Sequence, residues 1–457
     1  MKKIERRALL CLALAGVLAL GMVVFLVLFA VNGSGWAAAP FNRHLYNSDG
    51  ALASGTVLDR DGEVLSTVDE EGNRVYSDSR TTRMATLHVV GDLYGNVGTG
   101  ALTAFAKQLT GYTLLGGAYG ATEGSDVYLT IDADLNEVAY EALNGRKGTV
   151  AVYNYETGEI LCLVSSPSYD PVNIPDDLES NEAYEGAYVN RFFSATFTPG
   201  SVFKTVTLAA AVEEIPDLTE RTWVCDGSAE IGGGTVTCAA AHGEQDIRQA
   251  LANSCNKVFG ELAVELGGET MAKYVEQVGL TDSYSVNGID TAKGTFDLEG
   301  DGVSDTDLAW AGVGQYHDSA NPCSLLVYMG AIANGGRAAV PRLIQEVDRA
   351  GLLPALPQFT RRTGRLLSSE TAAFLAECMA NNVTSNYGTS RFPDMDLCAK
   401  SGTAEVGEND RPHAWFAGFL RNEDHPYAFV VLVENGGAGA EVAGNVASRV
   451  LRAAVGS

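Results

Sequence analysis

The chain has 457 residues, of which 46% are hydrophobic and 19% are charged, a composition typical of one large folded domain or two smaller ones. Its formal net charge of −26 argues against a nucleic-acid partner, because nucleic-acid binding requires clustered Lys and Arg side chains that neutralise phosphates. We interpret the acidic charge as a property of an extracellular surface that must stay soluble.

The N-terminus has the features of a membrane anchor. Residues 8–31 form an unbroken run of 24 apolar or small residues, and a helix of that length measures about 36 Å against a hydrocarbon core of about 30 Å. The basic residues before the run are Lys2, Lys3, Arg6 and Arg7. The positive-inside rule therefore predicts a cytoplasmic tail at residues 1–7, a single pass, and the rest of the chain outside. A cleaved signal peptide is the alternative, but its apolar run has only about 7–15 residues.

The next two segments precede the main domain. Residues 32–50 are polar and contain glycine, which is the composition of a tether. Within residues 51–125, two short apolar runs flank the pair Asp61-Gly62, and this pattern predicts a β-hairpin. The rest of this segment is rich in Gly, Thr and Tyr and is too short for a large core. We therefore predict a small, mainly β module.

Residues 126–457 are predicted to form the main domain. The pattern indicates a strand and an amphipathic helix up to about Leu143, then a β-hairpin that turns at residues 156–158, then an Ala- and Leu-rich helical middle. Two strands and a helix close the chain, at residues 414–420, 428–434 and 441–455. Strands at both ends with helices between them predict an α+β fold, in which the two ends of the domain build one mainly antiparallel sheet covered by helices.

The first candidate catalytic motif is Ser201-Val-Phe-Lys204, at the start of a predicted helix. A spacing of three places Lys204 one turn after Ser201 on the same face. A neutral lysine at that distance can take the hydroxyl proton and make Ser201 a nucleophile, and backbone N–H groups at the helix start can bind an oxyanion. The alternative is a helix cap beside a solvated lysine. Such pairs arise by chance, since Ser254 and Lys257 form a second one.

The second motif is Ser254-Cys-Asn256, which follows a predicted helix. Residues i and i+2 of a helix do not face each other, so both side chains can enter one cleft only from a turn between helices. From such a turn, Ser254 could pass on a proton and Asn256 could hold a substrate amide. By itself this motif is also compatible with an ordinary surface turn.

The third motif is Lys400-Ser401-Gly402-Thr403, predicted to lie on an edge strand beside the serine. The alternation of a strand directs Lys400 and Gly402 to one face and Ser401 and Thr403 to the other. Gly402 would leave room for the backbone of a ligand. The cation of Lys400 would attract a carboxylate and lower the pKa of Lys204. The alternative is an ordinary lysine on a sheet edge.

The cysteines suggest one disulfide and no metal site. Cys225 and Cys238 bracket a Gly-rich stretch that reads as a hairpin, and on the oxidising side of a membrane they are candidates for a disulfide, with two reduced thiols as the alternative. Other cysteines, Cys255 among them, lie in apolar contexts and read as buried small hydrophobic residues. There is no Cys-x-x-Cys spacing and the six histidines are scattered, so the sequence has no zinc pattern.

The order of the three motifs, each inside a longer matching stretch, resembles the class B penicillin-binding proteins, which are monofunctional peptidoglycan transpeptidases with one N-terminal anchor in the bacterial cell membrane. The resemblance covers nearly the whole chain. Further matching stretches are Thr56-Val-Leu-Asp-Arg-Asp-Gly, Leu129-Thr-Ile-Asp, Ser166-Pro-Ser-Tyr-Asp-Pro, Gly312-Val-Gly-Gln, Ala333-Asn-Gly-Gly and His413-Ala-Trp-Phe-Ala-Gly.

The resemblance implies a role for each motif. Ser201 would be acylated by the penultimate D-Ala of one stem peptide, with Lys204 as its base. Ser254 and Asn256 would assist proton transfer and hold the peptide. The segment from Lys400 to Thr403 would bind the terminal carboxylate, and the backbone N–H groups of Ser201 and Thr403 would form the oxyanion hole.

The resemblance also implies the partners of this reaction. An amine of a neighbouring stem peptide would attack the acyl-enzyme and close a cross-link, β-lactams would inhibit the enzyme, and a glycan polymerase of the SEDS type would be its membrane partner. No cofactor is expected. Two departures from the family pattern are Ser401 in place of the commoner Thr and a short N-terminal module.

Two alternatives remain at the level of sequence. A serine β-lactamase or D,D-carboxypeptidase would use the same motifs with water as the acceptor, but no Glu-x-x-Leu-Asn deacylation motif is present. A non-catalytic scaffold or antibiotic sensor would keep the fold, but the intact motifs argue against a scaffold and the short residues 1–7 against a sensor. The sequence leaves open whether the protein serves elongation, division or sporulation.

Overall fold

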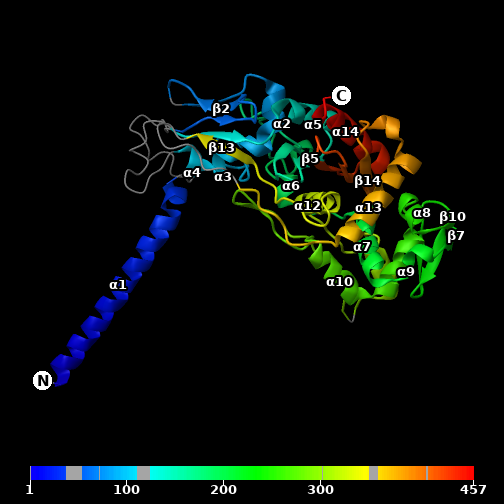
Figure 1. Ribbon diagram of the computed structural model, residues 1–457. Coiled ribbons are helices and arrows are strands. Elements are labelled where there is room, and N and C mark those ends of the chain that lie inside the picture. Colours follow the sequence, from blue (N-terminus) through cyan, green and yellow to red (C-terminus); the bar gives the residue numbers. More distant parts are fainter. Residues whose placement is uncertain are drawn as a thin grey trace.

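The first helix is a long apolar segment that extends away from the folded part of the protein (Figure 1). The computed structural model describes residues 2–37, 54–71, 73–110, 124–300, 302–348, 359–407 and 410–456. Helix α1 (Lys2–Ala37) contains the predicted span, and its Lys3–Gly33 part, in which an 18-residue window reaches a mean hydropathy of 2.9, is long and apolar enough to cross a membrane. The first residues of the expected tether, up to Ala37, continue this helix. Residues 38–50 of that tether lie outside the described part.

The main domain is built on a five-stranded sheet with the order β14-β15-β16-β5-β6. Its strands are β14 (Leu397–Ala404), β15 (His413–Leu420), β16 (Tyr427–Val433), β5 (Gly148–Asn154) and β6 (Ile160–Ser166). All neighbouring pairs are antiparallel. Two strands come from the start of the domain and three from its end, which confirms the predicted α+β architecture.

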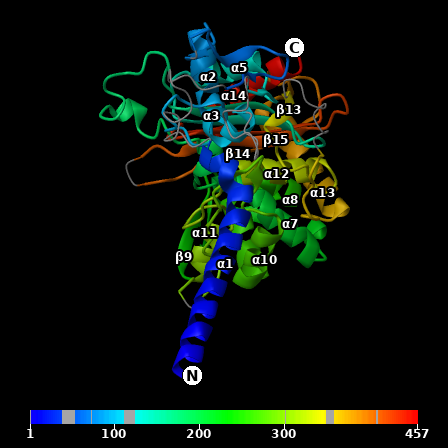
Figure 2. The same ribbon diagram turned by 90° about the vertical axis from the view of Figure 1, so that its left-hand side faces the viewer.

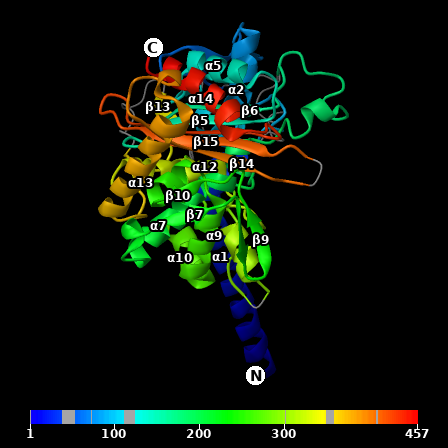
Figure 3. The ribbon, with the colours of Figure 1, turned by 90° about the vertical axis from the view of Figure 1, so that its right-hand side faces the viewer.

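Helices cover both faces of this sheet (Figure 3). Helices α5 (Ala133–Leu143) and α14 (Gly439–Ala454) pack on one face, and α12 (Pro322–Ala333) packs on the other. Alternate residues of β5 enter different cores: Val150 and Val152 pack on the side of α5 and α14, whereas Ala151 and Tyr153 pack on the side of α12. The strand is apolar at consecutive positions because both of its faces are buried.

The remaining helices gather on the α12 side of the sheet (Figures 2 and 3). They are α6 (Arg191–Ser194), α7 (Lys204–Glu214), α8 (Ile247–Ala252), α9 (Asn256–Leu266), α10 (Gly268–Gln277), α11 (Asp305–Ala311) and α13 (Ser369–Asn382). Two small two-stranded sheets lie next to them: β7 (Trp223–Cys225) pairs with β10 (Gly243–Gln245), and β8 (Ser228–Ile231) pairs with β9 (Gly234–Thr237). The first two sequence motifs lie in this helical part, and the third lies on the edge strand β14.

The N-terminal module shares a sheet with the main domain. This second sheet has the order β13-β4-β1-β2-β3, with strands β13 (Ile344–Asp348), β4 (Asp126–Leu129), β1 (Val57–Leu58), β2 (Val64–Val68) and β3 (Arg74–Tyr76). The predicted hairpin is β1 and β2. Strand β4 pairs with β1 on one side and with β13 on the other. The expected boundary between residues 125 and 126 therefore falls inside one sheet.

Helices contribute to this module as well as strands. Its helices are α2 (Arg80–Val90), α3 (Ala101–Ala104) and α4 (Ala106–Leu109). Helix α2 begins after Ser79, whose hydroxyl accepts a hydrogen bond from the backbone N–H of Thr82, and the helix packs on α5 of the main domain. Residues 51–53 and 111–123 of the expected module lie outside the described part. The module is therefore more helical than predicted and is continuous with the main domain.

Candidate active site

Ser201 lies in a short 3₁₀ turn, Gly200–Val202, directly before α7, which begins at Lys204. The turn presses against the edge strand β14. Gly200 has a φ of +55°, and a Cβ at this position would meet the carbonyl oxygen of Thr403 at 2.9 Å. A glycine is needed here for both reasons, and its place before the serine brings Ser201 close to the third motif.

Strands β14 and β15 contact the residues directly before Ser201. The indole Nε1 of the buried Trp415 donates a hydrogen bond of 2.9 Å to the carbonyl oxygen of Thr198. A Cβ on Gly402 would meet the carbonyl oxygen of Pro199 at 3.0 Å. The expectation that Gly402 makes room for a ligand backbone is therefore wrong, because the serine turn itself occupies that space.

Lys204 is fully buried and its ammonium group is the centre of the site. Its Nζ lies 3.0 Å from Ser201 Oγ, 3.1 Å from Ser254 Oγ and 2.6 Å from Asn256 Oδ1. Burial lowers the pKa of Lys204 to about 7. The main cause is burial, whereas the sequence-based expectation named the cation of Lys400. Near neutral pH, Lys204 can therefore exist as a free amine beside the hydroxyl of Ser201.

Ser254 lies in the predicted turn between two helices, α8 and α9, with a left-handed φ of +54°. Its Oγ lies 3.1 Å from the Nζ of Lys204 and 3.1 Å from the Nζ of Lys400. The amide of Asn256 has both ends engaged, because its Oδ1 accepts from Lys204 and its Nδ2 donates to the carbonyl oxygen of Thr237 at 2.7 Å. The hydroxyl of Ser254 thus connects the two lysines.

Lys400 lies on the edge strand β14, as predicted, but its side chain is fully buried, unlike that of an ordinary sheet-edge lysine. Its Nζ donates to Ser254 Oγ at 3.1 Å and to the carbonyl oxygen of Ser401 at 2.8 Å. Burial, together with the nearby charge of Lys204, lowers the pKa of Lys400 well below its usual value. Two adjacent buried amines cannot both hold a proton at low cost, so Lys400 is suited to proton exchange through Ser254.

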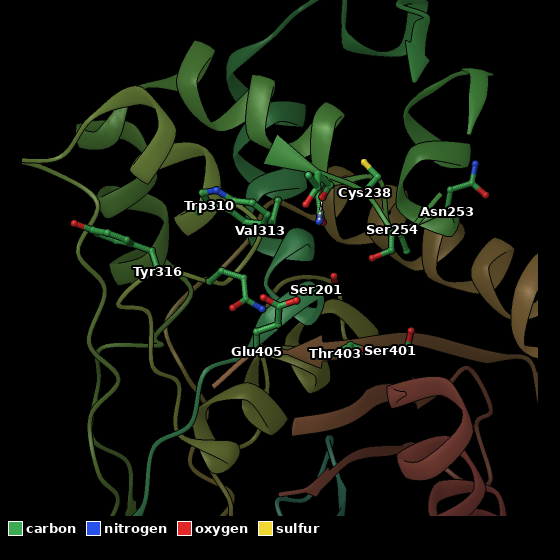
Figure 4. Close-up of a pocket in the computed structure, with 14 residues that line it drawn as sticks. Ser201, Cys238, Asn253, Ser254, Trp310, Val313, Tyr316, Ser401, Thr403 and Glu405 are labelled. Carbon is green, nitrogen blue, oxygen red and sulfur yellow. Dashed lines mark hydrogen bonds between the residues drawn. The ribbon is translucent and has the colours of Figure 1, made fainter. Parts of the chain in front are cut away.

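The two hydroxyl side chains of the third motif face a cavity of about 610 Å³ (Figure 4). Ser401 and Thr403 line it from β14, as the alternation predicted, and Ser201, Ser254 and Asn256 line it from the other elements. Lys204 and Lys400 are not among the described residues that line the cavity. The Nζ of Lys204 contacts the hydroxyls of Ser201 and Ser254, and the Nζ of Lys400 contacts the hydroxyl of Ser254. The hydroxyl of Tyr387 holds Ser401 through contacts of 2.9 Å with its Oγ and with its N–H.

Sequence reasoning missed most of the other residues around the cavity. They are Thr237, Cys238, Ala239, Asn253, Trp310, Val313, Gln315, Tyr316 and Glu405. Val313 and Gln315 lie in one of the matching stretches, and Glu405 follows the third motif by two residues, so these three had a signal. The others come from β9, α11 and segments next to helices and strands, and no local pattern reveals how close these lie to Ser201.

The alternative Ser254–Lys257 pair does not form a nucleophile and its base. The Nζ of Lys257 lies 3.2 Å from Glu261 Oε1, one turn further along α9. A partly exposed ion pair of this kind within one helix contributes little to stability. Lys204 is the lysine that contacts both serines.

The cysteine pair differs from the sequence-based expectation. Hairpin β8–β9 between Cys225 and Cys238 forms as predicted. The predicted disulfide is not formed, because the two sulfur atoms are 3.8 Å apart, whereas a bond requires about 2.05 Å. Cys238 Sγ lies at the same 3.8 Å from Cys255 Sγ. Cys255, read as an isolated buried residue, is therefore the third member of a thiol cluster.

The fold and this site define a class of active-site serine enzyme, and here a buried lysine lies 3.0 Å from the serine hydroxyl. Residues 148–452 match the penicillin binding protein transpeptidase domain. The chain therefore belongs to the penicillin-binding protein transpeptidase family, as the resemblance implied.

Individual relatives agree with this family. The chain is 31% identical over 343 residues to the peptidoglycan D,D-transpeptidase PbpA of Mycolicibacterium smegmatis, a match that covers 69% of this chain and 68% of that protein. The structure resembles the D,D-transpeptidase domain of a peptidoglycan glycosyltransferase from Eggerthella lenta, with a TM-score of 0.76, 27% identity and coverage of 89% and 98%. It also resembles the penicillin G acyl-enzyme of penicillin-binding protein A from M. tuberculosis, with a TM-score of 0.78, 25% identity and coverage of 89% and 100%.

Proposed function

We infer that the chain is a peptidoglycan D,D-transpeptidase that cross-links stem peptides through an acyl-enzyme on Ser201 and that β-lactams acylate the same residue. The observation that carries this inference is the 3.0 Å contact between Ser201 Oγ and the buried amine of Lys204, at the wall of an open cavity. The family of the chain and the penicillin G acyl-enzyme formed by its M. tuberculosis relative support it.

Acylation begins when neutral Lys204 takes the proton of Ser201 as Oγ attacks the carbonyl carbon of the penultimate D-Ala. The backbone N–H groups of Ser201 and Thr403 would stabilise the oxyanion. The leaving D-Ala amine needs a proton as its bond to the carbonyl carbon breaks. Lys204 returns that proton through the hydroxyl of Ser254, which contacts both lysines. The products are an ester on Ser201 and free D-Ala.

The second half-reaction reverses these proton transfers. An amine of a neighbouring stem peptide attacks the ester carbonyl and loses its proton to Lys204, and Oγ of Ser201 recovers a proton as the ester breaks. The result is an amide cross-link and free enzyme. The hydroxyls of Ser401 and Thr403 would bind the terminal carboxylate of the donor peptide, and their position in the wall of the cavity supports this role.

Ser201 is the residue expected to carry the acyl group. We expect mass spectrometry of the penicillin-treated full chain to place a single adduct on the peptide that contains Ser201, and Ser201→Ala to abolish labelling. Ser228→Ala, on the exposed hairpin strand β8, is the matched control and should label like the parent. Labelling that persists in Ser201→Ala, for example at Ser254, would refute the assignment.

The apolar helix α1 is proposed to anchor the protein in the bacterial cell membrane with its N-terminus in the cytoplasm. The basic residues before the apolar run support this orientation, and the length and hydropathy of Lys3–Gly33 support the span. The catalytic domain would then lie outside the membrane, where the peptidoglycan stem peptides are.

The same helix is the candidate contact for a glycan polymerase of the SEDS type, which family resemblance implies as a partner. A photo-crosslinker at Val17 of α1 should capture a polytopic membrane protein in cells, whereas one at the exposed Val172 should not. In the same cells, an impermeant thiol reagent should label a cysteine introduced at Val172 but not one introduced at Lys3. Labelling of the Lys3 position would contradict the orientation, and equal capture from both positions would contradict the contact.

A further inference from the structure

Four metal-binding side chains converge next to the second catalytic motif. Cys225 ends β7, Cys238 follows β9, His242 precedes β10, and Cys255 precedes α9. One potential ligand atom of each lies within 4.8 Å of the ligand atoms of all the others. These residues come from four separate segments, so the fold, and not local spacing, brings them together.

The distances within this cluster suit one tetrahedral ion. Cys238 Sγ lies 3.8 Å from Cys225 Sγ and 3.8 Å from Cys255 Sγ. Tetrahedral zinc with Zn–S bonds of about 2.3 Å places its sulfur ligands about 3.8 Å apart. A disulfide would use two of the sulfurs and leave the third unpaired, whereas one ion uses all three equally.

Two further features of this cluster indicate that it binds a ligand. Nδ1 of His242 is buried and has no hydrogen-bond partner within the described ranges, although buried ring nitrogens normally have one. Cys238 Sγ accepts a hydrogen bond of 3.4 Å from the backbone N–H of Lys257. Backbone N–H groups that point at a cysteine sulfur stabilise its thiolate, as the outer contacts of a metal site do.

We propose that Cys225, Cys238, His242 and Cys255 bind one zinc ion, and that this ion positions the turn that carries Ser254 and Asn256. Three thiolates and an imidazole are a donor set that zinc prefers, and four protein ligands close its shell, so the site is structural and takes no part in the chemistry. Binding converts the three thiols to thiolates and releases their protons to solvent, while the imidazole binds in its neutral form.

The surrounding structure gives such an ion a mechanical role. The pairs β7–β10 and β8–β9 are isolated two-stranded sheets, a form that is marginally stable in water without further support. Cys255 lies between Ser254, whose φ of +54° is unfavourable for a serine, and Asn256, whose side chain is bonded to Thr237 at the end of β9. One ion bound to Cys255 would tie this turn to both small sheets.

Metal content of the full chain is the direct test. We expect protein purified in detergent without chelators to contain one zinc ion per chain, and cobalt in its place to give the absorption of a tetrahedral thiolate site. Cys238→Ala and His242→Ala should lose the zinc. Cys162→Ala, which removes a buried thiol from β6 in the opposite core, is the matched control and should keep it.

A second measurement uses only the unsubstituted chain. It tests whether zinc positions the turn that carries Ser254 and Asn256, separately from any effect of a substitution on folding. Removal of zinc by a chelator should slow penicillin acylation about 10- to 100-fold, with the adduct still on Ser201, and added Zn²⁺ should restore the rate. This readout rests on the proposed function, but the metal content does not. Zinc binding without any acylation would refute the proposed function and leave the metal site standing.

Two results would overturn the proposal whatever the variants do. One is parent protein that is acylated at Ser201 but contains no zinc above background. The other is a Cys225–Cys238 disulfide in protein isolated from its native envelope, because oxidised sulfurs cannot serve as thiolate ligands. Equal zinc content in Cys238→Ala and in the parent would assign the ion to another site and contradict it as well.

Discussion

Replacement of Lys204 with methionine is expected to slow penicillin acylation of Ser201 by about 10³- to 10⁴-fold, which corresponds to about 4–5.5 kcal/mol of activation free energy. Methionine nearly retains the length and volume of the buried side chain but removes the amine that contacts Ser201 Oγ at 3.0 Å. The hydroxyl then has no base. Stopped-flow labelling with a fluorescent penicillin measures the rate, and thermal unfolding checks the fold.

The pH dependence of acylation identifies the same residue. Burial lowers the pKa of Lys204 from 10.5 to about 7, and only its neutral form can accept the proton of Ser201. The acylation rate of the parent should therefore fall about tenfold per pH unit below about 7 and reach a plateau above it. The residual rate of Lys204→Met should lack this step.

Lys257 provides the matched control for this substitution. It also follows a serine by three residues, but its Nζ pairs with Glu261. Lys257→Met should acylate at the parental rate and keep the pH step. A folded Lys204→Met protein that acylates within tenfold of the parent would exclude Lys204 as the base.

Replacement of Lys400 with methionine is the second large effect, and we expect acylation to slow by two or more orders of magnitude, about 3 kcal/mol or more. The Nζ of Lys400 is 3.1 Å from Ser254 Oγ, so its loss disturbs the hydroxyl that connects the leaving group to Lys204. Because Lys400 is fully buried, methionine should preserve the melting temperature better than alanine, which would leave a cavity.

Two donor peptides, one with a free terminal carboxylate and one with a terminal amide, distinguish a role of Lys400 through Ser254 from direct binding of the carboxylate. Thr403 lines the cavity, so Thr403→Val should reduce the preference for a donor peptide with a free terminal carboxylate over its amide. Lys400→Met should slow both donors by a similar factor, since Lys400 acts through Ser254. A selective loss of the free-acid donor in Lys400→Met would instead return Lys400 to the carboxylate site.

Local patterns in the sequence were sufficient for the parts of the site that depend on neighbouring residues. The spacing of Ser201 and Lys204, the turn around Ser254 and the alternation along β14 follow from the periods of a helix and a strand, which a few residues decide. The strands at both ends of the main domain were predicted for the same reason. The order of the motifs then indicated the family.

Only the tertiary structure decided the properties that depend on distant segments. The buried state of Lys204 and Lys400, and therefore their low pKa values, results from the packing of α7, α9 and β14 around them. Tertiary structure also decided that β4 pairs with β1 and β13. It likewise decided that Cys255 lies close to Cys225, Cys238 and His242. The burial of a side chain and the distances between potential ligand atoms both depend on contacts between segments that are far apart in the chain. Hydrophobic periodicity reports which face of an element is buried but not which partner buries it.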